Sequence, residues 1–297
     1  MKEYKIDQLP NSIKGSKNKS SRPKTRGFGY QVLGFGSGGI PFEGMTATGG
    51  NCISTVGDFK VHIFTSPGTF EVTKASTSSD ANEVQYLVVA GGGGMGYGYG
   101  GAGGAGGYRA AGCGPSPLQA SNIPTPVTTY PIAVGAAGAG SPVVPGPSGF
   151  PCGSSAGGNT TGLGLTATGG GGGASGSGGR VGKPGGSGSG AATAGAFSGA
   201  GGTGNQPPVS PPQGNPGEPA PSPQGEGNQG GGAVAAGTSA KTENGAPNSI
   251  DGTPRLYASG GRSASITPRA NSGFGGTEQA AAGCSGIVVI KYRIVEA

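Results

Sequence analysis

The side chains that could do chemistry are few in this chain and lie far apart in the sequence. His62 is the single histidine, and the acids considered with it are Asp58, Asp80 and Asp251. General acid–base catalysis and metal binding both need such groups gathered at one site. The sequence offers no credible acid–base pair, no metal cluster and no activated nucleophile. We therefore predict no catalytic residue, no metal site and no enzymatic activity.

One motif imitates a nucleotide-binding fingerprint. The apolar run 87–90 is followed by Gly91, Gly93 and Gly96, which matches the pattern GxGxxG. That fingerprint works because it opens a helix whose N-terminus holds a pyrophosphate. Glycines continue here for more than ten residues, so no helix can follow. We predict that the chain binds no nucleotide and needs no cofactor.

The cysteines also argue against a metal site. Cys52, Cys113, Cys152 and Cys284 are far apart and form no CxxC pair. With one histidine in the chain, the spacings do not fit a zinc site. Disulfides remain an alternative for an oxidising medium, but the pattern favours four small buried thiols.

Glycine and proline dominate the composition. The chain has 297 residues, of which 71 are glycine and 25 are proline, while hydrophobic residues make up 32% and charged residues 11%. Such a composition is typical of low-complexity or disordered chains. The apolar residues suffice for one modest core, and ordering so much glycine is costly. An ordered chain therefore needs a stabilising interaction other than hydrophobic burial.

Positive charge is concentrated at the N-terminus. Residues 1–26 hold eight basic and two acidic residues, a balance of +6 that equals the net charge of the chain. A solvated flexible tail, a nucleic-acid contact and a docking peptide for a larger assembly are the alternatives. The sequence contains no recognised nucleic-acid-binding module, which argues against nucleic acid as the partner. We favour docking onto a larger assembly, with these residues as the anchoring contacts: Lys2, Lys5, Lys14, Lys17, Lys19, Arg22, Lys24 and Arg26.

Short alternating segments predict an all-β fold. Strands are expected at 59–63, 70–72, 84–90, 129–134 and 287–295, because apolar residues recur there with a period of two or in short β-branched runs. No segment has helical periodicity. The simplest closure pairs the last strand with an early one, so a small β-sheet or sandwich scaffold carries a long glycine-rich insertion. We divide the chain into a basic arm with an anchoring strand, 1–45, and a glycine-rich β domain, 46–297.

A period of three runs through the glycine-rich insertion. Tyr99, Ala102, Ala105 and Tyr108 are spaced by three, and so are the glycines from Gly170 to Gly188, a phase that Ala191 and Ala194 continue. Three residues per turn is the repeat of a polyproline-II-type helix, which bonds only to neighbouring chains. The pattern favours packed polyglycine-II helices, with a flexible linker as the alternative; the runs are too short for collagen. The Pro-rich segment 205–229 is predicted to be a surface loop or a stiff linker.

The ordered blocks of the chain resemble a known family. In sequence they are 61–72, 84–94, 106–109, 130–135 and 285–292, and the resemblance is to the glycine-rich domain of bacteriophage tail-fibre and virion proteins, frequent in phages of marine bacteria and cyanobacteria. The chain departs from the usual pattern of this family at residues 280–284 and in the Pro-rich insert. These departures leave the number of polyglycine helices open.

That resemblance carries functional expectations. It implies a virion location, other virion proteins as partners and a fibre or adhesin role with attachment to a host receptor. By analogy with other fibres we also expect a homo-oligomer, such as a trimer. No membrane span is expected, because no segment is apolar enough to form one. A capsid decoration, head-fibre or tail-connector protein is the alternative, and an ice-binding or matrix protein is a weaker one. Candidate receptor contacts are Tyr97, Tyr99 and Tyr108, with packing on the scaffold as the competing role.

Overall fold

The computed structural model describes residues 41–142, 154–175, 181–193, 199–220, 227–262, 267–278 and 281–296. By its internal contacts the chain divides into the units Met1–Pro41 and Phe42–Ala297. Several predictions lie outside the described residues: the basic arm 1–26, the anchoring strand near 30–35, Cys152 and Ala194.

A seven-stranded sheet forms the middle of the scaffold. Its order is β2 (Cys52–Val56), β3 (Phe59–Phe64), β14 (Ile287–Arg293), β5 (Glu83–Val89), β6 (Tyr108–Ala111) and β7 (Gln119–Ala120), and β8 (Ile123–Pro124) also pairs with β5. All these pairs are antiparallel except β6 with β7. The last strand lies between β3 and β5, which confirms the predicted closure of the chain ends.

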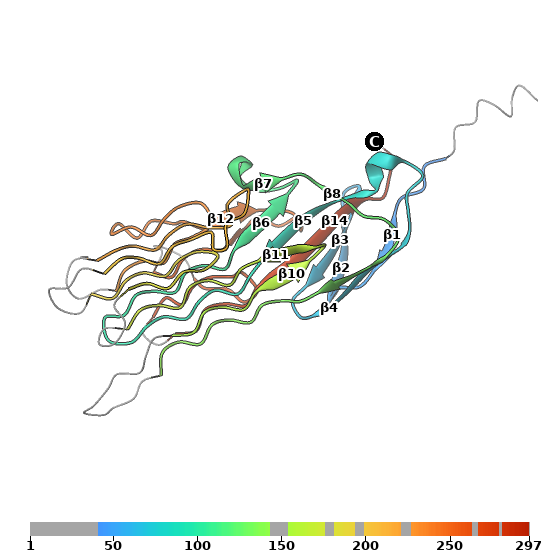
Figure 1. Cartoon of the computed structure of the whole chain (residues 1–297). Helices are drawn as coiled ribbons and strands as arrows, with labels where there is room; N and C mark the ends of the chain where they lie inside the picture. The colour runs from blue at the N-terminus through green and yellow to red at the C-terminus, as the bar shows by residue number, and fades with distance from the viewer. Residues whose placement is uncertain are drawn as a thin grey trace, which may run out of the picture. The chain divides into compact units, whose positions relative to one another are not determined.

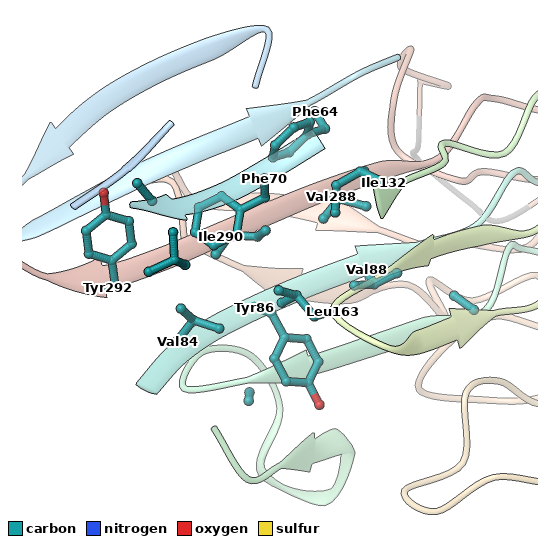
Figure 2. Close-up of a cluster of buried hydrophobic side chains, with 14 of the residues drawn as sticks. Phe64, Phe70, Val84, Tyr86, Val88, Ile132, Leu163, Val288, Ile290 and Tyr292 are labelled. Atoms are coloured by element: carbon teal, nitrogen blue, oxygen red, sulfur yellow. The ribbon is translucent and has the colours of Figure 1, made fainter. Parts of the chain in front are cut away.

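A second layer covers one face of this sheet. It contains the three-stranded sheet β1 (Thr46–Thr48), β4 (Gly68–Lys74) and β9 (Thr129–Ile132), together with the hairpin β10 (Thr160–Gly162) and β11 (Leu165–Ala167). Between the layers pack Phe64, Phe70, Tyr86, Ile290 and Tyr292 (Figure 2). The turn before β4 therefore joins two different sheets rather than forming a hairpin with β3.

The other face of the middle sheet is covered as well. Leu87, Val89 and Val289 pack there against Ile250 and Tyr257, from the hairpin β12 (Ala246–Asn248) and β13 (Arg255–Tyr257) and its turn. Because β5 and β14 are buried on both faces, their apolar residues run continuously instead of alternating with polar ones. The only helical segments in the described residues are the short 3₁₀ turns Ser79–Ala81 and Ser116–Leu118. The all-β prediction is confirmed.

Extended segments without a strand assignment leave one end of the sheets and lie side by side (Figure 1). We call them rods, and Figure 1 shows them extending away from the sheets, so that their far ends are the tips of the bundle. The described rods are 91–96, 101–107, 135–142, 154–159, 168–175, 181–184, 186–193, 199–204, 213–220, 227–233, 258–262, 273–278 and 281–286.

The hydrogen bonds of each rod repeat every third residue. In the rod 91–96, the N–H groups of Gly91 and Gly94 donate to the rod 154–159, and those of Gly93 and Gly96 donate to the rod 101–107. The remaining pair, Gly92 and Met95, donates to the rod 281–286. One rod thus bonds to three neighbours in rotation, which is the geometry of packed polyglycine-II helices. The prediction of an ordered bundle is confirmed for these residues.

Glycine is required where rods touch. A β-carbon at Gly93 would lie 2.1 Å from the Gly171 carbonyl oxygen, and one at Gly103 would lie 2.0 Å from the Gly93 carbonyl oxygen. Neither distance is tolerable, so the rods approach this closely only because both residues lack a side chain. Backbone hydrogen bonds across these contacts satisfy peptide groups that are buried away from water.

The period of three from residue 170 to 191 is shared by several rods, because Gly173, Gly182 and Gly188 belong to three different ones. One prediction about the insertion needs correction. The Pro-rich segment is not a loop throughout. Its residues 213–220 form a rod that donates to the rods 199–204 and 227–233, with Pro216 and Pro219 exposed on its outer side. Only 205–212 fits the predicted loop among the described residues of that segment.

Candidate functional site

The hairpin at residues 97–100 forms one of the tips where rods are joined. It connects the rods 91–96 and 101–107 and is closed by the Gly96 N–H, which donates to the Gly101 carbonyl oxygen at 3.1 Å. Gly98 and Tyr99 have φ values of +61° and +59°, which turn the chain back sharply. Tyr99 is 53% exposed, whereas Tyr97 is half-buried. The tip thus presents an aromatic side chain on a tightly bonded support.

A neighbouring rod holds the backbone of this tip in place. The Thr193 N–H donates to the Tyr99 carbonyl oxygen at 3.1 Å, and the Thr193 hydroxyl lies 3.4 Å from the same oxygen. Because these contacts hold the main chain of Tyr99 in place, the position from which its side chain projects is fixed. A tyrosine presented in this way suits contact with a partner, because it offers a large area at low entropic cost.

Basic side chains lie near the same end of the bundle. A β-carbon at Gly227 would lie 2.0 Å from the Gly100 carbonyl oxygen and 3.4 Å from Arg262 Nε, so Arg262 reaches the region of the tip. Burial lowers the pKa of Arg262. Burial also lowers the pKa of Lys241, an effect that nearby Arg262 strengthens and Glu218 opposes. Arg262 is therefore a basic group in the region of the tip.

Tyr108 is not a contact residue, which corrects one of the three predicted sites. It is 1% exposed, and its hydroxyl accepts a hydrogen bond from the Asn248 side-chain amide at 2.8 Å. Burial raises the pKa of Tyr108 to about 12. The physical reason is its place in the chain, because the rod 101–107 becomes β6 at this residue and enters the core. Packing on the scaffold, the alternative considered for Tyr108, is the role that it has.

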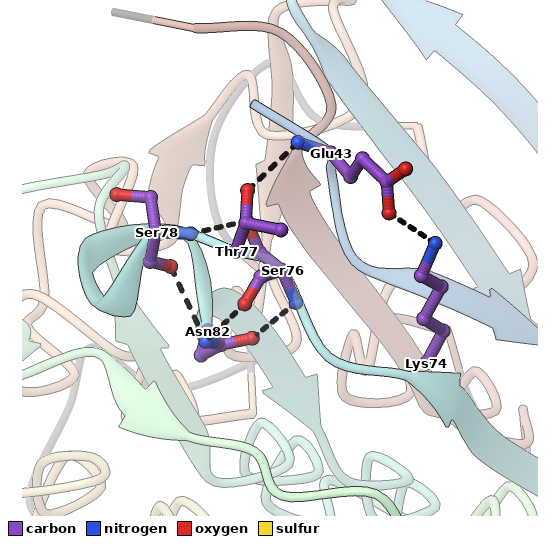
Figure 3. A network of polar contacts seen from close by, with 6 residues as sticks. All are labelled: Glu43, Lys74, Ser76, Thr77, Ser78 and Asn82. Atoms are coloured by element: carbon purple, nitrogen blue, oxygen red, sulfur yellow. Dashed lines mark hydrogen bonds and ion pairs between the residues drawn. The ribbon is translucent and has the colours of Figure 1, made fainter. Parts of the chain in front are cut away.

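The opposite end of the scaffold is where the described chain begins. The Glu43 N–H donates to the Thr77 hydroxyl at 2.9 Å, and the Thr77 N–H donates to the Glu43 carbonyl oxygen at 3.0 Å (Figure 3). Glu43 also forms an ion pair with Lys74. Asn82 braces the same loop, because its side chain bonds the main chain of Ser76 and Ser78. The first described residues, around Glu43, are thus fixed to the scaffold.

The residues considered for chemistry are separated in the structure. His62 is buried in β3, Asp58 lies in the turn before that strand, and Asp80 and Asp251 belong to two other loops. The GxGxxG run lies in the rod 91–96 and opens no helix. Both ring nitrogens of His62 are hydrogen-bonded. Nδ1 lies 2.6 Å from the Gly49 carbonyl oxygen, and Nε2 lies 3.2 Å from the Tyr292 hydroxyl. Since a carbonyl can only accept, Nδ1 carries the proton and Nε2 accepts from Tyr292.

The cysteines correct the prediction of four buried thiols. Cys52 is exposed on the edge strand β2, and Cys113 and Cys284 are half-buried, all three as thiols. Burial raises the pKa of the Cys284 thiol. The exposure of Cys52 could not be predicted from the sequence, because apolar and polar residues do not alternate in β2 and so do not show which of its residues face solvent.

Comparison with known proteins identifies a family whose match covers the rods and most of the scaffold. A family model described as a glycine-rich domain matches residues 65–293. This range runs from the turn before β4 to the end of β14 and includes every described rod. No curated protein matches the chain. Within the part of the chain that the structure describes, no helix is long and apolar enough to cross a membrane.

Proposed function

Since the chain belongs to the glycine-rich domain family, we propose that it is a structural, non-enzymatic protein of a bacteriophage particle. In this proposal it is a fibre or adhesin subunit, located in the virion, that is anchored by its N-terminus to other virion proteins. Its bundle of rods is displayed outward, and the tips contact a surface receptor of the host.

The placement of the rods carries this proposal. Their tips lie at the end away from the sheets, while the first described residues are bonded to the scaffold. A bundle linked by backbone hydrogen bonds in several directions resists bending, so it suits the display of short loops at a distance from an anchor. Many copies on one particle would convert weak individual contacts into avidity.

The exposed tip residue gives a direct test of receptor contact. We expect Tyr99→Ala to weaken the ability of the purified protein to block phage adsorption to cells, because an exposed tyrosine at a tip is a favourable contact. Ile53→Ala is the matched control, since Ile53 is an exposed apolar residue, 47% accessible, on the scaffold strand β2. Equal competition by both variants would remove Tyr99 from the proposed contact surface.

Anchoring is tested by removing the basic arm. Deleting residues 1–26 removes eight basic and two acidic residues. We expect the truncated protein to melt at the same temperature as the full chain but to be lost from assembled particles. Particles that carry the truncated protein at the normal level would contradict the anchor.

A decoration, head-fibre or tail-connector protein is the second candidate, and the basic arm is the feature that favours it. Such an arm could dock on an acidic capsid or baseplate surface. Purified protein that binds particles but never inhibits adsorption would support this candidate over an adhesin. Light scattering of the purified chain would test the proposed homo-oligomer and distinguish a trimer from a monomer.

A further inference from the structure

A polar cavity of about 190 Å³ lies at the end of the middle sheet where β14 ends and β5 begins. This is the end of the scaffold away from the rods (Figure 1). Neither the family match nor the proposed function assigns a role to it. The lining residues that matter here are Phe59, Asp80, Glu83, Gln85, Lys291 and Arg293.

The charges around this cavity are sorted by sign. The two cations, Lys291 and Arg293, come from β14, whereas the two acids come from β5 and the 3₁₀ turn before it. Lys291 and Gln85 face each other as cross-strand partners, so the positive and negative walls lie on neighbouring strands. A ligand in the cavity would therefore meet positive charge on one side and negative charge on the other.

These four charged groups do not neutralise one another. Among the described residues the ion pairs are Lys74 with Glu43 and Arg255 with Asp251, and neither involves the cavity. The cations contact rings instead: Lys291 Nζ lies 4.4 Å from the centre of the Phe59 ring, and the Arg293 guanidinium lies 5.9 Å from that of Phe42. Since no ion pair in the described part of the chain joins the acids to the cations of the cavity, both signs of charge are available to a ligand.

Two polar atoms beside the cavity have no partner. Gln85 Oε1 and Arg293 Nε are covered from solvent and form no hydrogen bond. Such groups are rare because their desolvation is not compensated. Both side chains are half-buried, and both residues line the cavity. One is an acceptor and the other a donor, which again matches a ligand of mixed character.

We propose that this cavity binds a small zwitterion of the α-amino-acid class. The ligand carboxylate bonds to Lys291 and Arg293, and its ammonium group bonds to Glu83, Asp80 and Gln85 Oε1. The volume is below that of sites for drug-sized molecules and suits a ligand of a few heavy atoms. The wall that carries Asp80 is preformed, because Asn82 holds its loop through three hydrogen bonds.

Titration of the full chain with glycine tests this assignment. We expect saturable chemical-shift changes at the Arg293 Nε–H and Gln85 side-chain amide signals, with a dissociation constant on the order of 1 mM. Acetate and methylammonium each carry one half of the ligand, and each should bind at least tenfold more weakly. Acetate that binds as tightly as glycine would overturn the proposal, because the acidic wall would then contribute nothing.

Variants locate the site. Arg293→Gln and Glu83→Gln should each weaken glycine binding at least tenfold, whereas Glu71→Gln, which removes an exposed carboxylate from β4, should leave it unchanged. Unaltered affinity in Arg293→Gln or Glu83→Gln would overturn the proposal. If either variant fails to fold, the signals of the unmodified chain decide: shifts confined to residues away from the cavity, or no saturation up to about 100 mM glycine, would refute it.

Discussion

Replacement of Gly103 by alanine tests whether contact between main chains stabilises the bundle. Gly103 lies in the interior rod 101–107, and its carbonyl oxygen accepts a hydrogen bond from the Gly261 N–H at 2.9 Å. An added β-carbon would lie 2.0 Å from the Gly93 carbonyl oxygen and 2.9 Å from the Gly276 nitrogen. The obstruction is backbone on both sides, so no side-chain rotation can relieve it.

The cost follows from the hydrogen bonds that must break. An ordinary contact with a β-carbon begins at 3.4 Å, so the rods would have to separate by 3.4 minus 2.0, or 1.4 Å. That movement stretches the bond from the Gly276 N–H to the Gly93 oxygen, now 2.8 Å, and the bond from the Gly93 N–H to the Gly104 oxygen, now 2.9 Å, beyond useful length. Leaving a buried polar group unbonded costs about 1–3 kcal/mol. Two such losses lower the free energy of unfolding by about 2–6 kcal/mol, a large part of the 5–15 kcal/mol of a typical domain.

Gly98→Ala is the matched control within the same hairpin. Gly98 has φ of +61°, but a β-carbon there meets nothing within 4 Å. Its replacement therefore costs only the backbone strain, about 1–2 kcal/mol. Denaturant unfolding of both variants measures the difference, and amide exchange of the rods 91–96 and 101–107 shows where it arises. A Gly103→Ala variant no less stable than Gly98→Ala would refute the view that close backbone packing stabilises the bundle.

Three further predictions concern other parts of the body. Gly182→Val should lower the melting temperature, since its β-carbon would lie 2.2 Å from the Ser189 carbonyl oxygen; an unchanged melting curve would contradict the packing of that rod. Tyr108→Phe should lower the free energy of unfolding by about 1 kcal/mol in denaturant titrations, because Asn248 loses an acceptor. Burial lowers the pKa of His62 from 6.5, so its stabilising effect is complete above pH 6.5 and is lost as the pH falls toward the lowered value. Unfolding free energies between pH 7 and 5 should show this loss, and His62→Gln should remove it.

The scaffold strands could be predicted because their apolar residues have a recognisable period. Val288, Ile290 and Tyr292 were expected on one face of the last strand, and they pack together in the core between the two layers. The edge strand β2 was missed because its residues are exposed or half-buried on both faces, so no period marks it. The short strand β6 was missed because only Tyr108 and Arg109 precede two alanines, a run too small to signal a strand.

The course of the rods could not be predicted, for a different reason. A period of three identifies the type of helix but does not mark where it turns, since a turn made by glycine can preserve the phase. Gly182 and Gly188 share the period, yet the chain reverses between them, and the Ser189 N–H donates back to the Lys183 carbonyl oxygen. Which rods become neighbours depends on contacts between residues far apart in the sequence, such as Gly103 with Gly276.

Buried amide side chains explain how rods that lack side chains keep a single register. Identical glycine surfaces could slide past one another by one repeat without losing hydrogen bonds, so glycine alone specifies the lattice poorly. Asn228, fully buried, donates to the Ala191 carbonyl oxygen at 2.8 Å, and Asn244 donates to the Gly230 carbonyl oxygen at 2.9 Å. Gln213 Oε1 accepts from the Thr168 N–H at 2.8 Å.

Each of these bonds joins one rod to one residue of another segment, so a slip of three residues would leave a buried amide without its partner. The penalty for that loss is comparable to the cost of breaking a backbone bond. The Pro-rich region therefore contributes more than spacing, because Gln213, Asn228 and Gln229 lie within the residues 205–229 and are all buried in the bundle. In this fold, buried polar side chains fix the register between neighbouring rods. In an ordinary sheet, hydrophobic side chains fix the register between strands.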